Sequence, residues 1–354
     1  MVISLALLFT TCMILSFWDD RFLERDKIIL YILFGVIMVL IAGLRVPGST
    51  PDSESYETMF YGTNNTIIEE ATEPSFKFIT GILHSLSLGI NSLFTIYALI
   101  SIAIHLPVLW KLSRFPLLAL TIYISYYYMM HEMVQIRAGV AVGLFLWAIY
   151  YYVNEKKLVA LGFILIGILF HYSATVGLVI FLLRNNITTW QKYVLYLVVP
   201  VGIMVYFANL DISYLVPDQF GGDKLTIYRK LRDAGNEEEL AGIRFERNPI
   251  IWMNMVLYYV CIIFRDYLTK YCKYVPIAIK LQAIGFCCLF FLKGFSMVVG
   301  NRLNDYFSIV SIILWIASVY AFYPTIMGKV ISNIISSIRF VASMLIYALS
   351  LLFM

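Results

Sequence analysis

The chain has 354 residues, of which 61% are hydrophobic and only 14% are charged, and its mean hydropathy is +0.83. A soluble domain of this size does not carry such a composition, so we expect an integral membrane protein. The formal net charge of +4 is small, and the Lys and Arg residues are scattered between apolar blocks, which argues against nucleic-acid binding. Membrane lipids are the expected anionic partners.

Ten apolar stretches are long enough, or nearly so, to cross a hydrocarbon core of about 30 Å, which takes about 20 helical residues. They lie near residues 1–18, 28–44, 91–110, 115–131, 134–153, 193–208, 249–264, 276–293, 303–323 and 330–354. No basic residues precede the first stretch, so we interpret it as a retained helix and not as a signal peptide. The pattern predicts an all-α polytopic membrane protein, with about 10–13 transmembrane helices in one domain covering residues 1–354.

Two further segments are harder to place. Residues 158–183 are too many for one plain span and have His171 near their middle. This predicts two half-helices that meet at a polar point, or one strongly tilted helix. Residues 75–90 are less apolar, and we expect them to form an interfacial or partly inserted helix.

Basic residues in short loops predict the orientation of the chain in the membrane, because they favour the cytoplasmic face. They form six clusters, namely Arg21/Arg25/Lys27, Lys111/Arg114, Lys156/Lys157, Arg184/Lys192, Arg265/Lys270/Lys273 and Lys329. Alternating spans bring all six to one face if 158–183 is a re-entrant hairpin and 75–90 does not cross. The opposite face then carries both termini and two large loops, 45–74 and 209–248.

The two large loops differ in character. The first is dense in turn residues, and Asp52 or Ser53 is placed to cap a helix that follows. The second, residues 209–248, mixes acidic and basic side chains. Its composition predicts short amphipathic helices over the membrane face, which would act as a mobile lid.

Four cationic or titratable residues lie at or beside the ends of apolar runs on the loop-bearing face: Arg45, Arg137, His171 and Arg302. Such residues are costly in lipid and therefore indicate a polar site. Arginine presents a planar fork of donors that matches phosphate oxygens. Beside Arg137, the small residues Ala138 and Gly139 leave room for a bulky ligand.

Each of these residues also has a structural explanation. Arg137 can extend its side chain to the membrane interface, and Arg302 can pair with Asp305 one turn later. Arg45 can bridge to Asp52 or Glu54. A lone His171 in an apolar run is often a hydrogen-bonded packing residue, although near neutral pH it can also accept a proton. The competing bases are Asp52 and Glu54.

Metal and cofactor chemistry has no support in the sequence. The five cysteines show neither CxxC nor Cys/His ligand spacing. The chain also lacks a phosphate-binding glycine loop, a GxSxG elbow and an HExxH pair. We therefore expect no metal and no cofactor.

Five short motifs occur in order along nearly the whole chain. They are Arg45 with Pro47-Gly48 and Asp52-Ser-Glu-Ser-Tyr56, Glu73-Pro74-Ser-Phe76, Gln135-Ile-Arg137-Ala, Leu169-Phe-His171-Tyr-Ser173-Ala, and Asn301-Arg302-Leu-Asn-Asp-Tyr306. In these motifs the chain resembles the EpsG/Wzy-type bacterial polysaccharide polymerases.

The resemblance implies a GT-C-like, metal-independent glycosyltransferase in the bacterial inner membrane, with its active site facing the periplasm. Its substrate would be an undecaprenyl-diphosphate-linked oligosaccharide, from which it would polymerise repeat units as an O-antigen polymerase does in lipopolysaccharide biosynthesis. A protein that regulates chain length is the expected partner.

The resemblance also implies roles for individual residues. Arg45, Arg137 and Arg302 would bind the diphosphate leaving group, whose developing charge arginines can neutralise. His171 or Asp52, together with Arg137, would carry the catalysis. We place Tyr56, Glu73 and Gln135 on the acceptor side, in contact with the glycan.

Two other functions fit the same composition. A transporter or flippase of lipid-linked oligosaccharide would also need a basic cavity, although such proteins usually show internal repeats, which this sequence lacks. A membrane acyltransferase with His171 as its base would modify the glycan without changing its polymerisation. A purely structural assembly subunit would give no reason for the convergent arginines.

Overall fold

The computed structural model describes residues 2–50, 52–62, 72–208, 245–293, 296–322 and 325–352. Every regular element in these ranges is a helix, which confirms the all-α fold class. The amphipathic helices and the lid predicted for 209–248 fall mostly outside the described residues. Of that loop the structure describes only its end, where Phe245–Arg247 forms the short 3-10 helix η5.

Five of the described helices are long and apolar enough to cross a bilayer: α2 (Glu24–Gly43), α6 (Ile90–Leu112), α8 (Ile136–Val153), α10 (Thr189–Ala208) and α18 (Thr325–Leu352). The number rises to seven if two bent pairs each count as one span, namely α13 (Pro249–Ile263) with α14 (Arg265–Tyr271), and α16 (Met297–Ser308) with α17 (Ser311–Ser318) and the following turn η6 (Val319–Ala321). Shorter apolar helices include α1 (Val2–Ser16), α9 (Lys157–Phe170), η2 (Tyr172–Leu182) and α15 (Val275–Phe291). The chain is therefore a polytopic membrane protein, while the larger number of spans stays a prediction.

The chain divides into two compact units, which are described separately. Unit 1 comprises Met1–Leu178 and Trp315–Met354, and unit 2 comprises Val179–Leu314. The expected single domain stays a prediction.

One end of unit 1, here called the basic end, is defined by contacts after α1. Asp19 accepts a hydrogen bond at 2.9 Å from the backbone N–H of Leu117, in the first turn of α7 (Pro116–Ile122). Asp20 pairs with Lys329 in the first turns of α18. The end of α1 and the beginnings of α7 and α18 therefore meet at the basic end.

The other end of unit 1, here called the site end, is defined by contacts after α2. The side chain of Asn91, in the first turn of α6, donates to the carbonyl of Gly43 at 3.3 Å and to that of Arg45 at 2.9 Å. Tyr347, late in α18, donates to the carbonyl of Ser49. Because α2 finishes where α6 begins, the segment 75–90 between them does not cross to the basic end.

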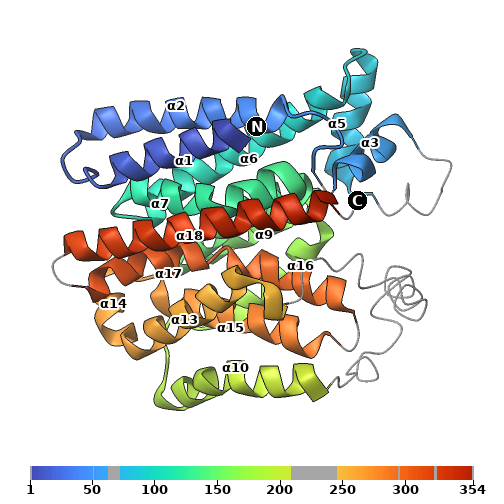
Figure 1. Cartoon of the computed structure of the whole chain (residues 1–354). Coiled ribbons are helices and arrows are strands. Elements are labelled where there is room, and N and C mark those ends of the chain that lie inside the picture. Colours follow the sequence, from blue (N-terminus) through green and yellow to red (C-terminus); the bar gives the residue numbers. More distant parts are fainter. Residues whose placement is uncertain are drawn as a thin grey trace. The chain divides into compact units, whose positions relative to one another are not determined.

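Two short helices cover the site end of unit 1, as Figure 1 shows. They are α3 (Ser53–Tyr61) and α5 (Pro74–Ser85). Asp52 takes the N-cap position of α3, as expected, although its side chain makes no capping bond. Pro74 opens α5, where its missing N–H costs nothing. Nε2 of His84 lies 2.7 Å from the carbonyl oxygen of Phe60, which joins the two helices.

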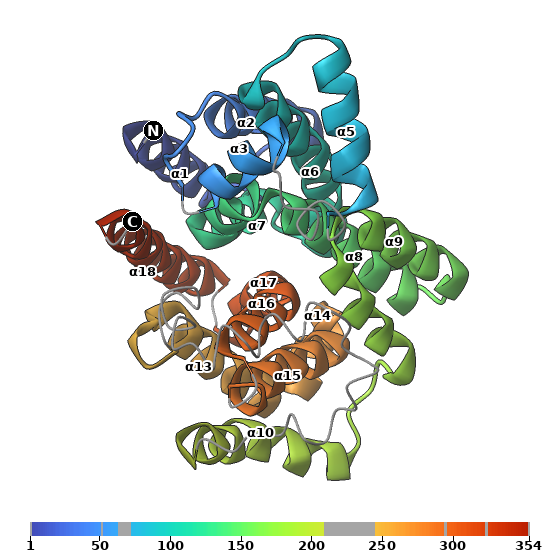
Figure 2. The same ribbon diagram turned by 90° about the vertical axis from the view of Figure 1, so that its right-hand side faces the viewer.

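Helix α8 lies beside α6 and α9 in unit 1 (Figure 2) and runs parallel to α6. Its beginning packs with the beginning of α6 in one hydrophobic cluster, and Trp147 near its end donates to the carbonyl of Ile104 at 3.1 Å. Helix α8 therefore ends at the basic end. The four basic clusters of unit 1 gather there, at Arg21/Arg25/Lys27, Lys111/Arg114, Lys156/Lys157 and Lys329.

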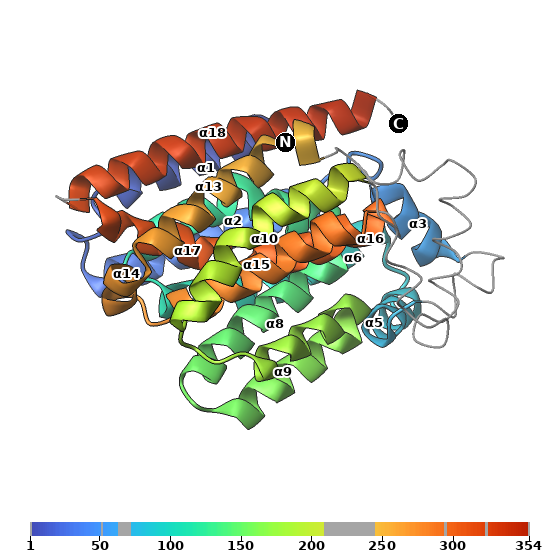
Figure 3. The same cartoon turned by 90° about the horizontal axis from the view of Figure 1, so that it is seen from below.

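Two apolar segments of unit 1 are not plain α-helices. After α7 the chain continues as the π-helix η1 (Tyr123–Val134), and α8 begins after Gln135. Helix α9 stops at His171, whose backbone is extended with φ −154° and ψ 121°, and the 3-10 helix η2 follows. The prediction of two half-helices meeting at His171 is therefore confirmed. Figure 3 shows α5 next to this end of α9.

Unit 2 contains α10, α13, α14, α15 and α16. Side-chain caps fix two of its helix starts. Asn248 accepts from the backbone N–H of Ile250 at 3.0 Å before α13, and Ser296 accepts from that of Val299 at 3.3 Å before α16. Cap residues satisfy backbone N–H groups that have no partner inside the helix.

Candidate active site

A buried carboxylate joins two of the predicted site residues at the site end of unit 1. Glu73, immediately before α5, is only 2% exposed. One of its oxygens lies 2.9 Å from Nδ1 of His171, and the other forms an ion pair with Nη1 of Arg137. The three residues come from the N-cap of α5, the first turn of α8, and the break between α9 and η2. The structure thus brings Glu73, Arg137 and His171 together, and we call them the Glu73 triad.

The charge state of Glu73 follows from two opposing effects. Burial by itself raises the pKa of the carboxyl group, but the hydrogen bond from His171 and the charge of Arg137 outweigh burial and lower the pKa to about 2. Glu73 is therefore a carboxylate at neutral pH. A carboxylate only accepts hydrogen bonds, so both of its partners must donate.

This requirement fixes the tautomer of His171. Nδ1 carries the proton that it donates to Glu73, so in the neutral imidazole the lone pair lies on Nε2. A carboxylate that holds a histidine in this way orients the ring and stabilises the imidazolium that forms when Nε2 takes a proton. The His171 side chain is 21% exposed, so the ring is only partly buried.

Aromatic rings hold Arg137 in place. Its guanidinium carbon lies 5.3 Å from the ring centre of Tyr56 and 5.5 Å from that of Phe76. Both rings belong to the buried cluster of α3, α5, α6 and α8. The Arg137 side chain is 18% exposed, but its Nε is buried and has no hydrogen-bond partner among the described residues. The two rings and the pair with Glu73 therefore fix the guanidinium, which is partly exposed at the site end.

Gly139 serves helix packing, and the space beside it is already filled. A Cβ atom at Gly139 would lie 2.6 Å from the backbone carbonyl oxygen of His131 in η1. The expectation that Gly139 leaves room for a ligand is therefore wrong. The absent side chain lets η1 and α8 approach closely, two residues after Arg137.

Arg45 is buried at 3% exposure, away from the solvent. Its Nη1 donates to the carbonyl of Ala42 at 2.7 Å and to that of Glu132 at 3.3 Å. Its guanidinium lies 3.7 Å from the ring centre of Phe94, a member of the same aromatic cluster as Tyr56. Burial lowers the pKa of Arg45 to about 10, so the residue stays charged. The buried guanidinium of Arg45 is not exposed to a ligand in this structure. Its role in diphosphate binding stays a prediction.

The remaining predicted residues of unit 1 are Asp52, Tyr56 and Gln135. The backbone carbonyl of Asp52 accepts from the N–H of Tyr56 at 3.1 Å in the first turn of α3. The ring of Tyr56 lies against Arg137. Gln135 lies at the junction of η1 and α8, two residues before Arg137. The contact of Asp52, Tyr56 and Gln135 with a substrate stays a prediction.

Arg302 belongs to unit 2. It is exposed on α16, one turn before Asp305. Its predicted part in diphosphate binding is untested.

A second polar cluster in unit 1 was missed by the sequence analysis. Glu132, only 1% exposed, accepts hydrogen bonds from Ser101 at 2.9 Å and from the Tyr123 hydroxyl. Nδ1 of His105 lies 3.5 Å from the same oxygen. The sequence did carry a signal for this cluster. Glu132 and His105 are ionisable residues within apolar runs, and such residues seldom face lipid.

A buried cation on α18 was missed as well. Arg339 is fully buried, and its guanidinium lies 5.3 Å from the ring centre of Tyr127 and 5.8 Å from those of Tyr126 and Trp315. Arginine stacks well on aromatic faces, which partly replaces lost hydration. Arg339 lies in the middle of the last apolar run, and this position could have identified it as a buried cation.

Comparison with known proteins gives one match. Residues 28–354 match the family model described as the EpsG family. No curated protein and no solved structure matches the chain. The matched range contains all three residues of the Glu73 triad.

Proposed function

The chain belongs to the EpsG family, and we propose that it polymerises undecaprenyl-diphosphate-linked oligosaccharide repeat units at the periplasmic face of the bacterial inner membrane. Family membership indicates a polysaccharide polymerase with glycosyltransferase-like activity. The substrate, the face of the membrane and the residue roles are our proposals.

The Glu73 triad is the observation that supports this chemistry. In glycosyl transfer, an acceptor hydroxyl attacks the anomeric carbon of the donor sugar, a new C–O bond forms, and the bond from that carbon to the diphosphate oxygen breaks. The hydroxyl proton passes to Nε2 of His171, which Glu73 orients. The diphosphate leaves with the lipid carrier.

Arg137 stabilises the departing diphosphate. Its pair with Glu73 holds one nitrogen, and 18% of its side chain is exposed at the site end. A fixed cation aimed at charge that develops on a leaving group is often the largest catalytic contribution. Arg137 and His171 contact the two oxygens of one carboxylate, so the base and the cation are held close to the same reacting bond.

The distribution of charge supports the periplasmic assignment. In unit 1 the Glu73 triad lies at the site end, whereas four clusters of Lys and Arg lie at the basic end. Basic residues in short loops favour the cytoplasmic side. The site end then faces the periplasm, where lipid-linked repeat units would be joined.

The test uses a strain that lacks its own copy of the gene and expresses the wild-type or a variant chain. We expect Arg137→Ala to yield single repeat units without long polymer, while the protein still accumulates in the membrane. The matched control is Arg114→Ala, an exposed arginine at the basic end, which should give normal chain lengths. Normal polymer with Arg137→Ala would remove this residue from the proposal.

Two other outcomes would replace the proposed activity. If deletion of the gene stops repeat units from reaching the periplasmic face, the protein is a transporter. If deletion leaves polymer length intact but removes a substituent from the glycan, the protein is a modifying transferase.

A further inference from the structure

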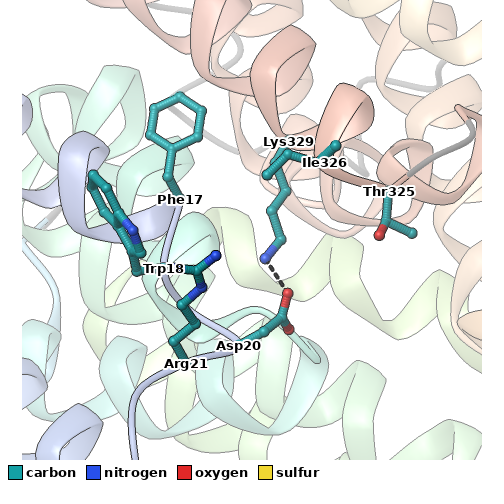
Figure 4. A pocket seen from close by; sticks show the side chains of 7 residues that line it. All are labelled: Phe17, Trp18, Asp20, Arg21, Thr325, Ile326 and Lys329. Atoms are coloured by element: carbon teal, nitrogen blue, oxygen red, sulfur yellow. Dashed lines mark hydrogen bonds and ion pairs between the residues drawn. The ribbon is translucent and has the colours of Figure 1, made fainter.

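A cavity lies at the basic end of unit 1, whereas the Glu73 triad lies at the site end. Its volume is about 520 Å³. It opens between the turn after α1 and the start of α18, and Figure 4 shows the side chains that surround it. They are Phe17, Trp18, Asp20, Arg21, Thr325, Ile326 and Lys329.

The cavity has an excess of positive charge. Lys329 is 2% exposed, pairs with Asp20 and lies 4.4 Å from the ring centre of Phe115. Asp20 is thus already neutralised. Arg21 extends its guanidinium toward the cavity (Figure 4) and has no acidic partner among the residues that the structure describes. One arginine fork is therefore available to an anion.

Polar groups of α18 complement this arginine. Thr325 begins the helix and lines the cavity with its side chain. The first N–H groups of a helix have no partners within it, and their partial positive charge favours anions. The arginine fork, the buried lysine and this helix start together form an arrangement that suits phosphate oxygens.

The surroundings of the cavity are apolar. Trp18 is 44% exposed and Ile326 is 53% exposed, and Val330 follows on α18 at 38%. Exposed apolar side chains on membrane-spanning helices contact lipid, and tryptophan favours the interface with water. A ligand that fills the cavity therefore meets cations at one end and a lipid-facing helix surface at the other.

We propose that this cavity binds the phosphate of an anionic phospholipid, whose acyl chains lie along the exposed apolar faces of α1 and α18. The basic end is the cytoplasmic end in our orientation, and anionic lipids of the cytoplasmic leaflet attract basic segments there. The lipid would fasten the turn after α1 to the start of α18. This site is separate from catalysis, so its test does not depend on polymerase activity.

The test measures lipid binding to the full-length chain purified in neutral detergent. Dioctanoyl phosphatidylglycerol is titrated and bound lipid is counted by native mass spectrometry, with dioctanoyl phosphatidylcholine and inorganic phosphate in parallel. We expect Arg21→Ala to weaken phosphatidylglycerol binding about tenfold or more, because a charge-assisted contact is lost. Arg21→Lys keeps the positive charge but not the planar guanidinium, so its affinity for phosphatidylglycerol should lie between those of the wild type and Arg21→Ala.

The matched control is Arg25→Ala, which removes a nearby exposed basic residue in the first turn of α2 that does not line the cavity. It should bind as the wild type does. Equal weakening by both variants would show general surface charge and overturn the proposal. Equal binding of phosphatidylcholine would show that the anionic headgroup is not selected. Displacement of the lipid by inorganic phosphate at matched concentration would assign the cavity to a soluble anion instead.

Discussion

Nδ1 of His171 and Oε1 of Glu73 lie 2.9 Å apart, although 98 residues separate them in the sequence. The same carboxylate holds Arg137 with its other oxygen. Taken alone, the histidine and the arginine each have a structural explanation. Because one carboxylate holds both, they form one unit with a base, an orienting group and a cation. The predictions below test how that unit is held together and what it does.

Removing the charge of Glu73 should destabilise unit 1. In Glu73→Gln the largely buried guanidinium of Arg137 loses its counter-ion, and breaking a buried ion pair from one side costs about 3–5 kcal/mol. Urea or thermal unfolding in detergent measures the loss. Glu54→Gln, an exposed glutamate on α3, is the matched control and should unfold as the wild type does. Equal stability of both variants would show that the pair contributes nothing to the fold.

The same carboxylate predicts a loss of stability in acid. Its pKa is lowered from 4.5 to about 2 in the folded protein, so the stabilisation is fully present above pH 4.5 and disappears as the pH falls toward 2. The loss amounts to about 3 kcal/mol. Unfolding measured across this range should show a steeper fall for the wild type than for Glu73→Gln. Parallel curves would contradict the lowered pKa.

Two features of the site followed from the sequence. Arg137 and His171 were identified because charged or titratable residues at the ends of apolar runs are costly in lipid. The break at His171 followed from a run too long for one span. Both conclusions rest on local information, and the structure agrees with the break.

Other features needed tertiary contacts. Glu73 was expected to bind the acceptor, and its contacts with residues 64 and 98 positions away carry no local signal. Arg45 was expected to bind the diphosphate, but a residue beside a turn-rich loop can equally fold inward onto a ring such as Phe94. The close approach of Gly139 to His131 likewise depends on how η1 packs, which hydropathy does not report.

That approach gives a paired glycine prediction. Gly139→Ala places a methyl group against a backbone oxygen that cannot rotate away, so we expect a loss of about 1–3 kcal/mol and reduced polymer as Arg137 shifts. Gly162→Ala on α9 meets nothing within 4 Å and should stabilise its helix by about 0.5–1 kcal/mol. Unfolding midpoints and polymer ladders of the two variants check this. An unaffected Gly139→Ala would show that η1 and α8 are not tightly packed.

The proton transfer proposed for His171 is tested most directly by the initial rate at which the purified chain releases lipid diphosphate from a lipid-linked repeat unit. We predict that His171→Ala lowers this rate by about 10²–10⁴-fold and that added imidazole partly restores it. His84→Ala, which removes a histidine that joins α3 to α5, should keep nearly the wild-type rate. A wild-type rate in His171→Ala without imidazole would contradict the account, because no proton would then pass through the ring that Glu73 holds.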